Sequence, residues 1–268
     1  MVKGVEKMFS TDRFESSRVE VLGVYGSDLN VVNAARVSFN KQKDKLDKKD
    51  ENLIHYLLHH EHWTPFAHAT IQLRITAPIF VARQWFRHTI GVGRNEVSRR
   101  YVDNEVTYWL PEYFRLKAEN KKQGSLDQRH EKNDELIKEY IRVVDNCNHL
   151  YTKLIALGVA PEQARAILPQ AAMTSWVETG SLYYYMRFCL LRNEEHAQKE
   201  IQELAQYIED FVIKPHFPLS YKALQKERAL RELKFHMYKL DEKEIGLMKK
   251  LVNQVKNLKS FLKLPKKL

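Results

Sequence analysis

The sequence is poor in cysteine and contains no long apolar run. Only two cysteines occur among 268 residues, Cys147 and Cys189, and each lies within an apolar helical pattern. We interpret them as buried free thiols, because two isolated cysteines form neither a disulfide framework nor a zinc-ligand pattern. No run of eighteen apolar residues is present, which excludes a membrane-spanning helix. The first residues, MVKGVEKMFSTDRFES, lack the apolar core of a secretory signal, so we expect a cytoplasmic protein.

Acidic residues are also in deficit, since 44 lysines and arginines outnumber 34 aspartates and glutamates to give a net charge of +10. Half of this excess lies in residues 241–268, where eight lysines accompany three acidic residues. Apolar residues alternate with lysine there at helical spacing, which indicates an amphipathic basic helix. That helix could contact RNA or an acidic partner, or pack on its own domain. The rest of the chain is only mildly basic, which favours small anionic ligands at least as strongly as a polyanion.

Hydrophobic periodicity divides the chain into a mixed first part and a helical second part. Ile71, Leu73 and Ile75 alternate with polar residues, which is typical of a strand, and Pro78 is suited to the first turn of a helix. Strands therefore cluster in the first 110 residues, which predicts an α+β fold. The predicted strands are 19–25, 70–76 and 107–110; the helices are 29–38, 52–60, 79–88, 134–157, 161–168, 180–192 and 193–214; irregular loops are expected at 89–96 and 117–133.

Lysine is absent from residues 83–101, RQWFRHTIGVGRNEVSRRY, although the whole chain has 27 lysines and 17 arginines. The cations of this window are Arg83, Arg87, Arg94, Arg99 and Arg100. A guanidinium binds phosphate through two parallel hydrogen bonds, which an ammonium cannot do. Gly91 and Gly93 would let backbone N–H groups turn toward an anion, and Ser98 adds a hydroxyl. We interpret the window as a cradle for a phosphomonoester; the alternative is surface ion pairing with Glu96, Asp103 and Glu105.

Two further arginines, Arg165 and Arg192, lie in apolar surroundings. Arginine is rarely buried without a partner, so each implies an anionic ligand or a carboxylate. The carboxylates available along the chain are Glu162, Glu178 and Glu194.

Histidines gather in HYLLHHEHWTPFAH, residues 55–68. The i, i+4 spacing of His55 and His59 is compatible with a metal. However, no cysteine or carboxylate recurs at the spacing of a zinc site, so we predict no metal. His62 and Thr64, which follow the predicted helix, are better candidates for ligand contacts.

The arginine window resembles the signature of the flavin-dependent thymidylate synthases, RHRx7S, here RQWFRH followed by NExSxRY. Other blocks similar to those of the family follow in family order between about residues 19 and 215: AARVSF (34–39), H-x-TPF-x-H (62–68), APIFVARQWFRH (77–88), ARAILP (164–169) and LLRNEEHAQKEI (190–201). The chain departs from the signature at Thr89, where the family has arginine, and by one extra residue before Ser98. Arg94 could supply the missing charge. Ser181 stands where the family often has asparagine, and Arg187 where an asparagine or histidine contacts the flavin.

The resemblance implies a small, mostly antiparallel sheet packed with long helices. A catalytic domain would occupy residues 1–220, and a helical basic extension residues 221–268. The implied reaction is reductive methylation of dUMP to dTMP, with methylenetetrahydrofolate as carbon donor, FAD as hydride carrier and NADPH as reductant. The implied assembly is a homotetramer whose active sites are shared between subunits.

The resemblance also implies roles for individual residues, with Arg192 as the catalytic residue beside N3 of the pyrimidine. The residues implied for dUMP are Gln84, Arg87, Ser98, Arg99, Arg100, Arg165 and Arg192. Those implied for FAD are Ser38, Thr64, Arg87, His88, Thr89, Ile90, Glu96, Ser181 and Arg187.

Elementary chemistry is compatible with this reaction. C5 of uracil is a poor nucleophile, and a thiolate that adds to C6 is one remedy, but it needs a reactive cysteine near basic groups. Neither Cys147 nor Cys189 is placed in that way, although Arg187 lies near Cys189 in the sequence. The other remedy is a cation that stabilises the N3-deprotonated ring, since an adjacent opposite charge lowers a pKa by about 1–3 units. Arginine suits this role because it keeps its own proton.

Two other functions would use the same residues. An RNA-binding module would need exposed aromatic side chains between the basic residues, as Trp85 and Phe86 could be between Arg83 and Arg87. Their apolar helical context favours the core instead, so we do not expect a nucleic-acid partner. A metal-dependent hydrolase would need the histidine cluster. Only the flavin enzyme predicts yellow protein, because flavin absorbs near ~450 nm.

Overall fold

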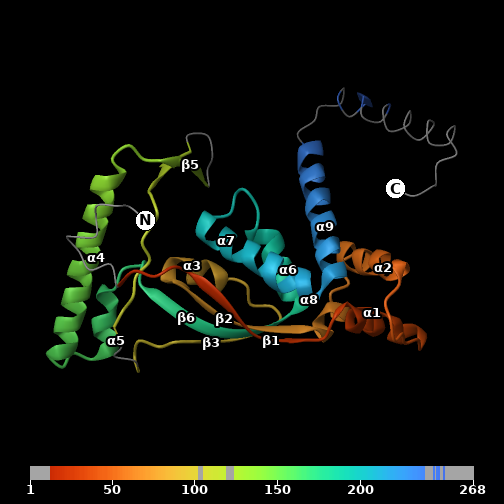
Figure 1. Ribbon diagram of the computed structural model, residues 1–268, viewed down its shortest axis with the longest axis horizontal. Coiled ribbons are helices and arrows are strands. Elements are labelled where there is room, and N and C mark those ends of the chain that lie inside the picture. The colour runs from red at the N-terminus through yellow and green to blue at the C-terminus, as the bar shows by residue number, and fades with distance from the viewer. Residues whose placement is uncertain are drawn as a thin grey trace.

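The computed structural model describes residues 13–101, 105–118 and 124–238, and the isolated residues 244, 246, 247 and 250. A sheet runs along one side of the molecule, with helices on one of its faces and at both of its ends (Figure 1). In chain order the elements are β1 (Arg18–Tyr25), α1 (Asp28–Arg36), η2 (Val37–Phe39), α2 (Lys48–His59), η3 (Thr64–His68), β2 (Thr70–Pro78), α3 (Ile79–Trp85), β3 (Val92–Glu96), β4 (Arg115–Lys117), β5 (Ser125–Arg129), α4 (Asn133–Ala156), α5 (Pro161–Ala164), η4 (Arg165–Ile167), β6 (Met173–Ser181), α6 (Leu182–Arg192), α7 (Lys199–Ile208), the π-helix η5 (Glu209–Ile213), α8 (Lys214–His216) and α9 (Pro218–Met237).

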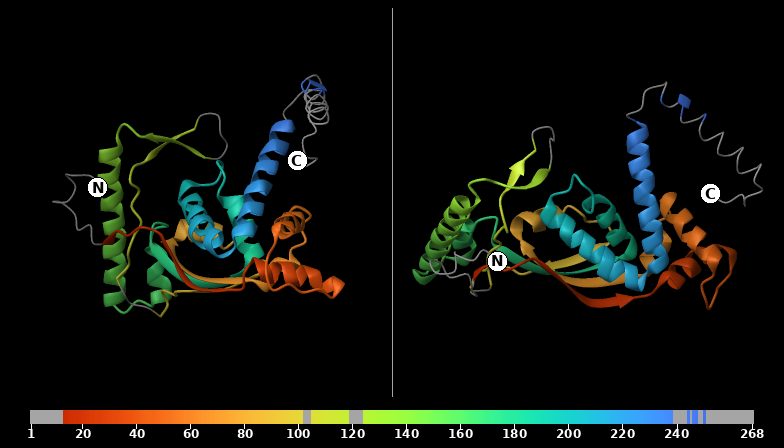
Figure 2. Two further views of the ribbon diagram at one scale, coloured as in Figure 1. Left: turned by 45° about the vertical axis from the view of Figure 1, so that its right-hand side comes forward. Right: turned by 45° about the horizontal axis from the view of Figure 1, so that its top comes forward.

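The main sheet has the strand order β1-β2-β6-β3, and every neighbouring pair is antiparallel. This confirms the predicted α+β fold with a small antiparallel sheet. Ile71, Leu73 and Ile75 of β2 are fully buried, as their alternation predicts. They belong to one apolar core with residues of α3, α6 and α7, and these helices cover one side of the sheet (Figure 2). Between these buried positions, Gln72 of β2 donates a hydrogen bond to Thr179 of β6.

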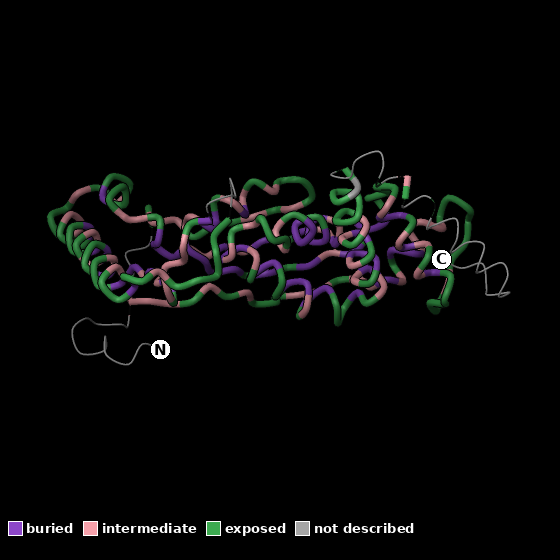
Figure 3. The backbone as a smooth tube through the Cα atoms, turned by 90° about the horizontal axis from the view of Figure 1, so that it is seen from above, coloured by how far each residue is buried: buried purple, intermediate pink, exposed green. Residues whose placement is uncertain are grey.

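Two helix groups pack at the ends of the sheet. α4 and α5 lie at one end around a small apolar cluster that includes Tyr108 and Val144, while α1, α2 and α9 lie at the other. Buried backbone concentrates in the middle of the molecule, and much of α4 is exposed (Figure 3). α9 crosses residue 220 without interruption, and the N–H groups of Leu219 and Ser220 donate to Asp28 of α1. Most of the predicted basic tail at 241–268 lies outside the described residues.

Two strands of the sheet differ from the sequence-based prediction. The glycine-containing segment predicted as a loop at 89–96 contains β3, so Gly93 pairs with Thr179 in the sheet instead of turning toward an anion. Strands are also not confined to the first 110 residues, because β6 lies in the centre of the sheet. The hydrogen bonds that β6 makes to both neighbours hold this segment extended.

Smaller corrections concern the flanking segments. The predicted loop at 117–133 contains β5, which pairs with β4. Residues 107–110 form no strand beyond isolated bridges at Tyr108. The helix predicted over 79–88 is shorter, because α3 ends at Trp85 in a tight turn and Arg87 and His88 follow it. Residues 193–198 are turn and bend, and α7 begins only at Lys199.

Candidate active site

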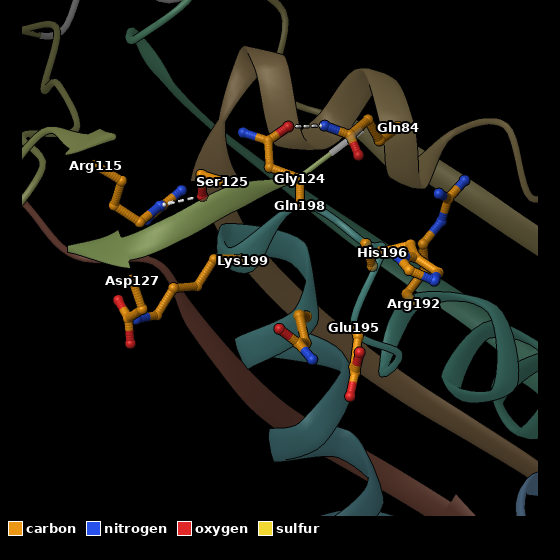
Figure 4. Close-up of a pocket in the computed structure, with 12 residues that line it drawn as sticks. Gln84, Arg115, Gly124, Ser125, Asp127, Arg192, Glu195, His196, Gln198 and Lys199 are labelled. Atoms are coloured by element: carbon orange, nitrogen blue, oxygen red, sulfur yellow. Dashed lines mark hydrogen bonds and ion pairs between the residues drawn. The ribbon is translucent and has the colours of Figure 1, made fainter. Parts of the chain in front are cut away.

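Two cavities meet where the end of α3, the end of α6 and the start of α7 approach one another. The larger, of about 710 Å³, lies between the β4–β5 hairpin and the α7 N-terminus (Figure 4). The smaller, of about 200 Å³, lies along α6. Arg192, the last residue of α6, lines both. The larger cavity is lined by Gln84, Arg115, Gly124, Ser125, Asp127, Arg192, Glu195, His196, Ala197, Gln198, Lys199 and Gln202.

These cavities bring together many of the residues singled out in the sequence. Gln84 and Arg192, predicted to bind dUMP, line the larger cavity. Residues predicted to bind FAD line the smaller one: Arg87, His88, Thr89, Ile90 and Arg187. Ser181 lies at the N-cap of α6, where its hydroxyl accepts a hydrogen bond from the Tyr184 N–H.

Arg192 keeps its charge available for a ligand. Its Nε donates a hydrogen bond to His88 Nε2 over 3.0 Å. Among the described residues, no carboxylate lies within ion-pair distance of Arg192, Arg87 or Arg187. Burial lowers the pKa of the Arg192 guanidinium, Glu194 opposes this effect and Arg87 adds to it. Three cations without carboxylate partners at one place are suited to an anionic ligand.

His88 must be neutral to hold Arg192 in this way. Nε2 accepts the hydrogen bond from Arg192, so the ring proton is on Nδ1. Burial, together with the charges of Arg192, Arg187 and Arg94, lowers the pKa of His88 to about 4. The imidazole therefore orients Arg192 at neutral pH without competing with it for an anion.

Arg94 does not supply the charge that Thr89 lacks. Its guanidinium forms an ion pair of 2.8 Å with Glu178, whose side chain is fully buried, and it stacks on Phe86. The same carboxylate also accepts hydrogen bonds from the indole N–H groups of Trp85 and Trp176. Glu178 is thus the partner of Arg94 and not of Arg165 or Arg192. Arg94 Nη2 also donates a hydrogen bond to the hydroxyl of Tyr184, which lines the smaller cavity.

A second group of predicted residues lies toward the other end of the sheet. Val92 pairs with Gly180, whereas the Val97 N–H donates to Ser175 O, five residues further along β6. Five residues of a strand span about 17 Å, so Ser98 begins far from the Arg192 cavities. The members of this group are Ser98, Arg99, Arg100, Glu96 and Arg165. Arg100 forms an exposed ion pair of 3.6 Å with Glu162, and Glu96 accepts a hydrogen bond from Thr174.

Ser38 and Thr64 form a third group near the opposite end. Ser38 is exposed in η2, and Thr64 is exposed at the start of η3. Val37, beside Ser38, lines an open hollow that also includes Tyr25 and His68. One chain therefore does not bring all the predicted site residues together.

The histidine cluster and the cysteines offer no competing centre in the part of the chain that the structure describes. No group of three or more His, Cys, Asp or Glu side chains there is arranged to hold a metal ion. His59 instead contacts Glu227 of α9 at 3.0 Å. Both cysteines are free thiols, Cys189 buried and Cys147 half-buried. Burial raises the pKa of the Cys189 thiol well above its usual value, which opposes thiolate formation.

Sequence reasoning missed several residues of the larger cavity. Arg115 comes from β4 just before the predicted loop, and no motif singles it out. His196, Gln198 and Lys199 belong to the block LLRNEEHAQKEI and line the cavity, but the helix predicted at 193–214 hid the turn at 193–198 that precedes α7. A break in apolar periodicity between Leu191 and Ile201 was the available signal.

Comparisons with known proteins agree with one another. Residues 20–219 match the family described as thymidylate synthase complementing protein. A flavin-dependent thymidylate synthase from Thermosipho melanesiensis is 40% identical over 188 residues, which cover 70% of this chain and 81% of that protein. One from Wolbachia pipientis is 39% identical over 212 residues, which cover 76% and 72%.

Solved structures show the same fold. The crystal structure of a UMP/dUMP methylase, PolB from Streptomyces cacaoi, bound with 5-Br dUMP, superposes with a TM-score of 0.71 at 27% identity. The match covers 80% of this chain and 96% of that one. None of the helices described here is long and apolar enough to cross a bilayer.

Proposed function

Because this chain belongs to the family of flavin-dependent thymidylate synthases, an enzyme family that methylates dUMP to dTMP, we propose that it carries out this reaction in its complete reductive form. Methylenetetrahydrofolate donates the carbon, and NADPH supplies the hydride by way of FAD. No protein cysteine adds to the pyrimidine. The observation that carries the proposal is the pair of cavities joined at Arg192, a cation without a carboxylate partner among the described residues.

Arg192 is the residue we expect to activate the substrate. Its guanidinium is half-buried and held by neutral His88, so it can face the pyrimidine at N3. An adjacent cation favours the N3-deprotonated ring, which makes C5 more nucleophilic. Partial exclusion of water strengthens this effect. Gln84, on the same cavity wall, binds dUMP beside it.

The chemistry of the smaller cavity fits FAD. Arg87 and Arg187 provide positive charge for its phosphates, and the hydroxyl group of Thr89 provides a hydrogen bond. Ser181, at the N-cap of α6, would contact FAD from outside this lining. When bound, FAD supplies hydride transfer between the reductant and the methylated pyrimidine. The chain's own residues orient the substrate and exclude water from it. The high pKa of the Cys189 thiol supports a route without a nucleophilic cysteine.

We propose that the separated groups meet between subunits of a homotetramer. Ser98, Arg99, Arg100 and Arg165 of one copy would reach the dUMP phosphate held at Arg192 of another. Ser38, Thr64 and Glu96 would likewise reach FAD across an interface. Val92 and Val97 lie beside positions of β6 that are ~17 Å apart. This separation supports the arrangement, because side-chain motion within one chain cannot bring Ser98 to Arg192.

Three wider predictions accompany the function: cytoplasmic location, no nucleic-acid partner, and a division into residues 1–220 and 221–268. The helix α9, from Pro218 to Met237, crosses the boundary of this division and contacts α2 through Glu227 and His59.

Purified protein tests the proposal. It should be yellow, release FAD on denaturation, and form dTMP from dUMP only when methylenetetrahydrofolate and NADPH are both supplied. Colourless protein that takes up no FAD would contradict the proposed function and favour the RNA-binding or hydrolase alternative. If turnover requires FAD but does not depend on the folate, only the assignment of the carbon donor is contradicted.

A further inference from the structure

A chain of four polar side chains runs from the hairpin to the wall of the larger cavity. Arg115 Nη2 donates to Glu200 Oε1 over 2.7 Å. Gln198 Nε2 donates to Glu200 Oε2 over 2.8 Å. Gln84 Nε2 then donates to Gln198 Oε1, a contact drawn as a dashed line in Figure 4. Glu200 is largely buried and lies outside the lining of this cavity, whereas Gln84 and Gln198 line it.

The direction of these bonds follows from the carboxylate. An ionised carboxylate has no proton to donate, so both of its neighbours must present hydrogens to it. Gln198 therefore turns its amide nitrogen toward Glu200 and its oxygen toward Gln84. Gln84 must then donate through its own nitrogen, which leaves Oε1 as its remaining polar atom. No described residue donates a hydrogen bond to this oxygen, and in Figure 4 it points away from Gln198.

We propose that Glu200, acting through Gln198, is a positioning residue that fixes Gln84 with its carbonyl oxygen toward the larger cavity. An amide can present either a donor or an acceptor, and this relay selects the acceptor. The substrate is thereby recognised at Gln84 through one of its own hydrogen-bond donors. On dUMP that donor is the 3′-hydroxyl, because N3 is assigned to Arg192. The inference rests on the proposed binding of dUMP at Gln84 and adds what determines the polarity of that contact.

Glu200→Gln reverses the relay without touching the cavity. The new amide keeps its oxygen on the Arg115 guanidinium, so its nitrogen faces Gln198. Gln198 and then Gln84 turn over, and Gln84 presents N–H to the substrate. The 3′-hydroxyl must then accept a hydrogen bond from Gln84 instead of donating one, so the dissociation constant of dUMP itself should change by less than about 10-fold. Any change should appear in KM and not in kcat, because the contact exists in both the ground state and the transition state.

The diagnostic measurement uses an analogue of dUMP in which fluorine replaces the 3′-hydroxyl, because fluorine can accept a hydrogen bond weakly but cannot donate one. The analogue should bind wild-type protein about 10-fold more weakly than dUMP, and that penalty should shrink in Glu200→Gln, where Gln84 donates. Equal penalties in both proteins would overturn the inference. Glu227→Gln is the matched control, because Glu227 is also buried and ion-paired with an arginine, Arg231, but lies in α9. It should leave the discrimination between dUMP and the analogue unchanged.

Gln198 allows a second test at an exposed position. Gln198→Leu removes both hydrogen bonds of the relay but keeps the ion pair between Arg115 and Glu200. Gln84 can then present either its oxygen or its nitrogen, so the relay predicts that the variant loses the preference for dUMP over the fluoro analogue. A preference equal to that of the wild type would overturn the inference. Failure of wild-type protein to bind dUMP at all would instead refute the proposed function on which the relay rests.

Discussion

His88 makes stability depend on pH in a defined window. Its pKa in the folded protein is about 4, against an ordinary value of 6.5, because of burial and the cations Arg192, Arg187 and Arg94. The unfolded chain therefore binds more protons than the folded chain between these two values. The stabilisation is complete above about pH 6.5 and is lost as the pH falls toward 4.

The size of the effect follows from the shift. When the pH falls from 7 to 5, an unscreened histidine with these two pKa values lowers the free energy of unfolding by about 2 kcal/mol. His88 is only half-buried, so solvent screening reduces this to about 1 kcal/mol. Protonation of His88 also removes the acceptor for Arg192 Nε, so Arg192 should lose its fixed orientation over the same pH range.

Urea denaturation at pH 7 and pH 5 measures this contribution. His88→Gln is the matched variant, since an amide oxygen can still accept from Arg192 but does not titrate. The wild type should lose about 1 kcal/mol more than the variant between the two pH values. Titration of the imidazole C2–H resonance by NMR, assigned by its absence in His88→Gln, should give a pKa near 4. A pKa near 6.5, or equal losses in both proteins, would refute the reasoning.

The other predictions concern the activating cation, the thiols and the buried ion pair. Arg192→Ala should lower dTMP formation by at least about 100-fold while flavin absorbance shows FAD still bound; loss of the flavin would mean that the role assigned to Arg192 is wrong. The double variant Cys147→Ala, Cys189→Ala should keep turnover within about 10-fold, whereas a folded but inactive protein would restore a thiolate mechanism. Arg94→Met leaves the charge of Glu178 buried and unpaired, so the free energy of unfolding should fall by about 3–5 kcal/mol in urea denaturation; a loss below about 1 kcal/mol would contradict the pairing.

The elements that sequence reasoning predicted are those whose buried face is apolar. β2 alternates cleanly, and α4 carries a regular apolar stripe, so both were found. β3 and β6 were missed for a shared reason. Their inward positions include Arg94 and Glu178, which are register partners in the sheet and neutralise each other there. A charged residue at a core position looks like a loop residue until its partner, eighty-four positions away, is known.

The candidate site was predictable where the family motif is local, and unpredictable where it depends on long-range packing. RQWFRH places Gln84, Arg87 and His88 at the cavities because α3 and the following turn carry them together. The relay through Gln198 and Glu200 has no local signature. It depends on β4 approaching the start of α7, which no periodicity encodes.

The strand order has a consequence for how the chain folds. β2 and β3 lie close in sequence, yet β6 separates them in the sheet. The ribosome synthesises β6 nearly eighty residues after β3. During synthesis only the β1–β2 ribbon can assemble early, and its inner edge stays open until residues 173–181 leave the ribosome. Such long-range closure slows folding and exposes an unpaired apolar edge in the meantime. A chain truncated before β6 would therefore be an aggregation hazard, not a smaller folded enzyme.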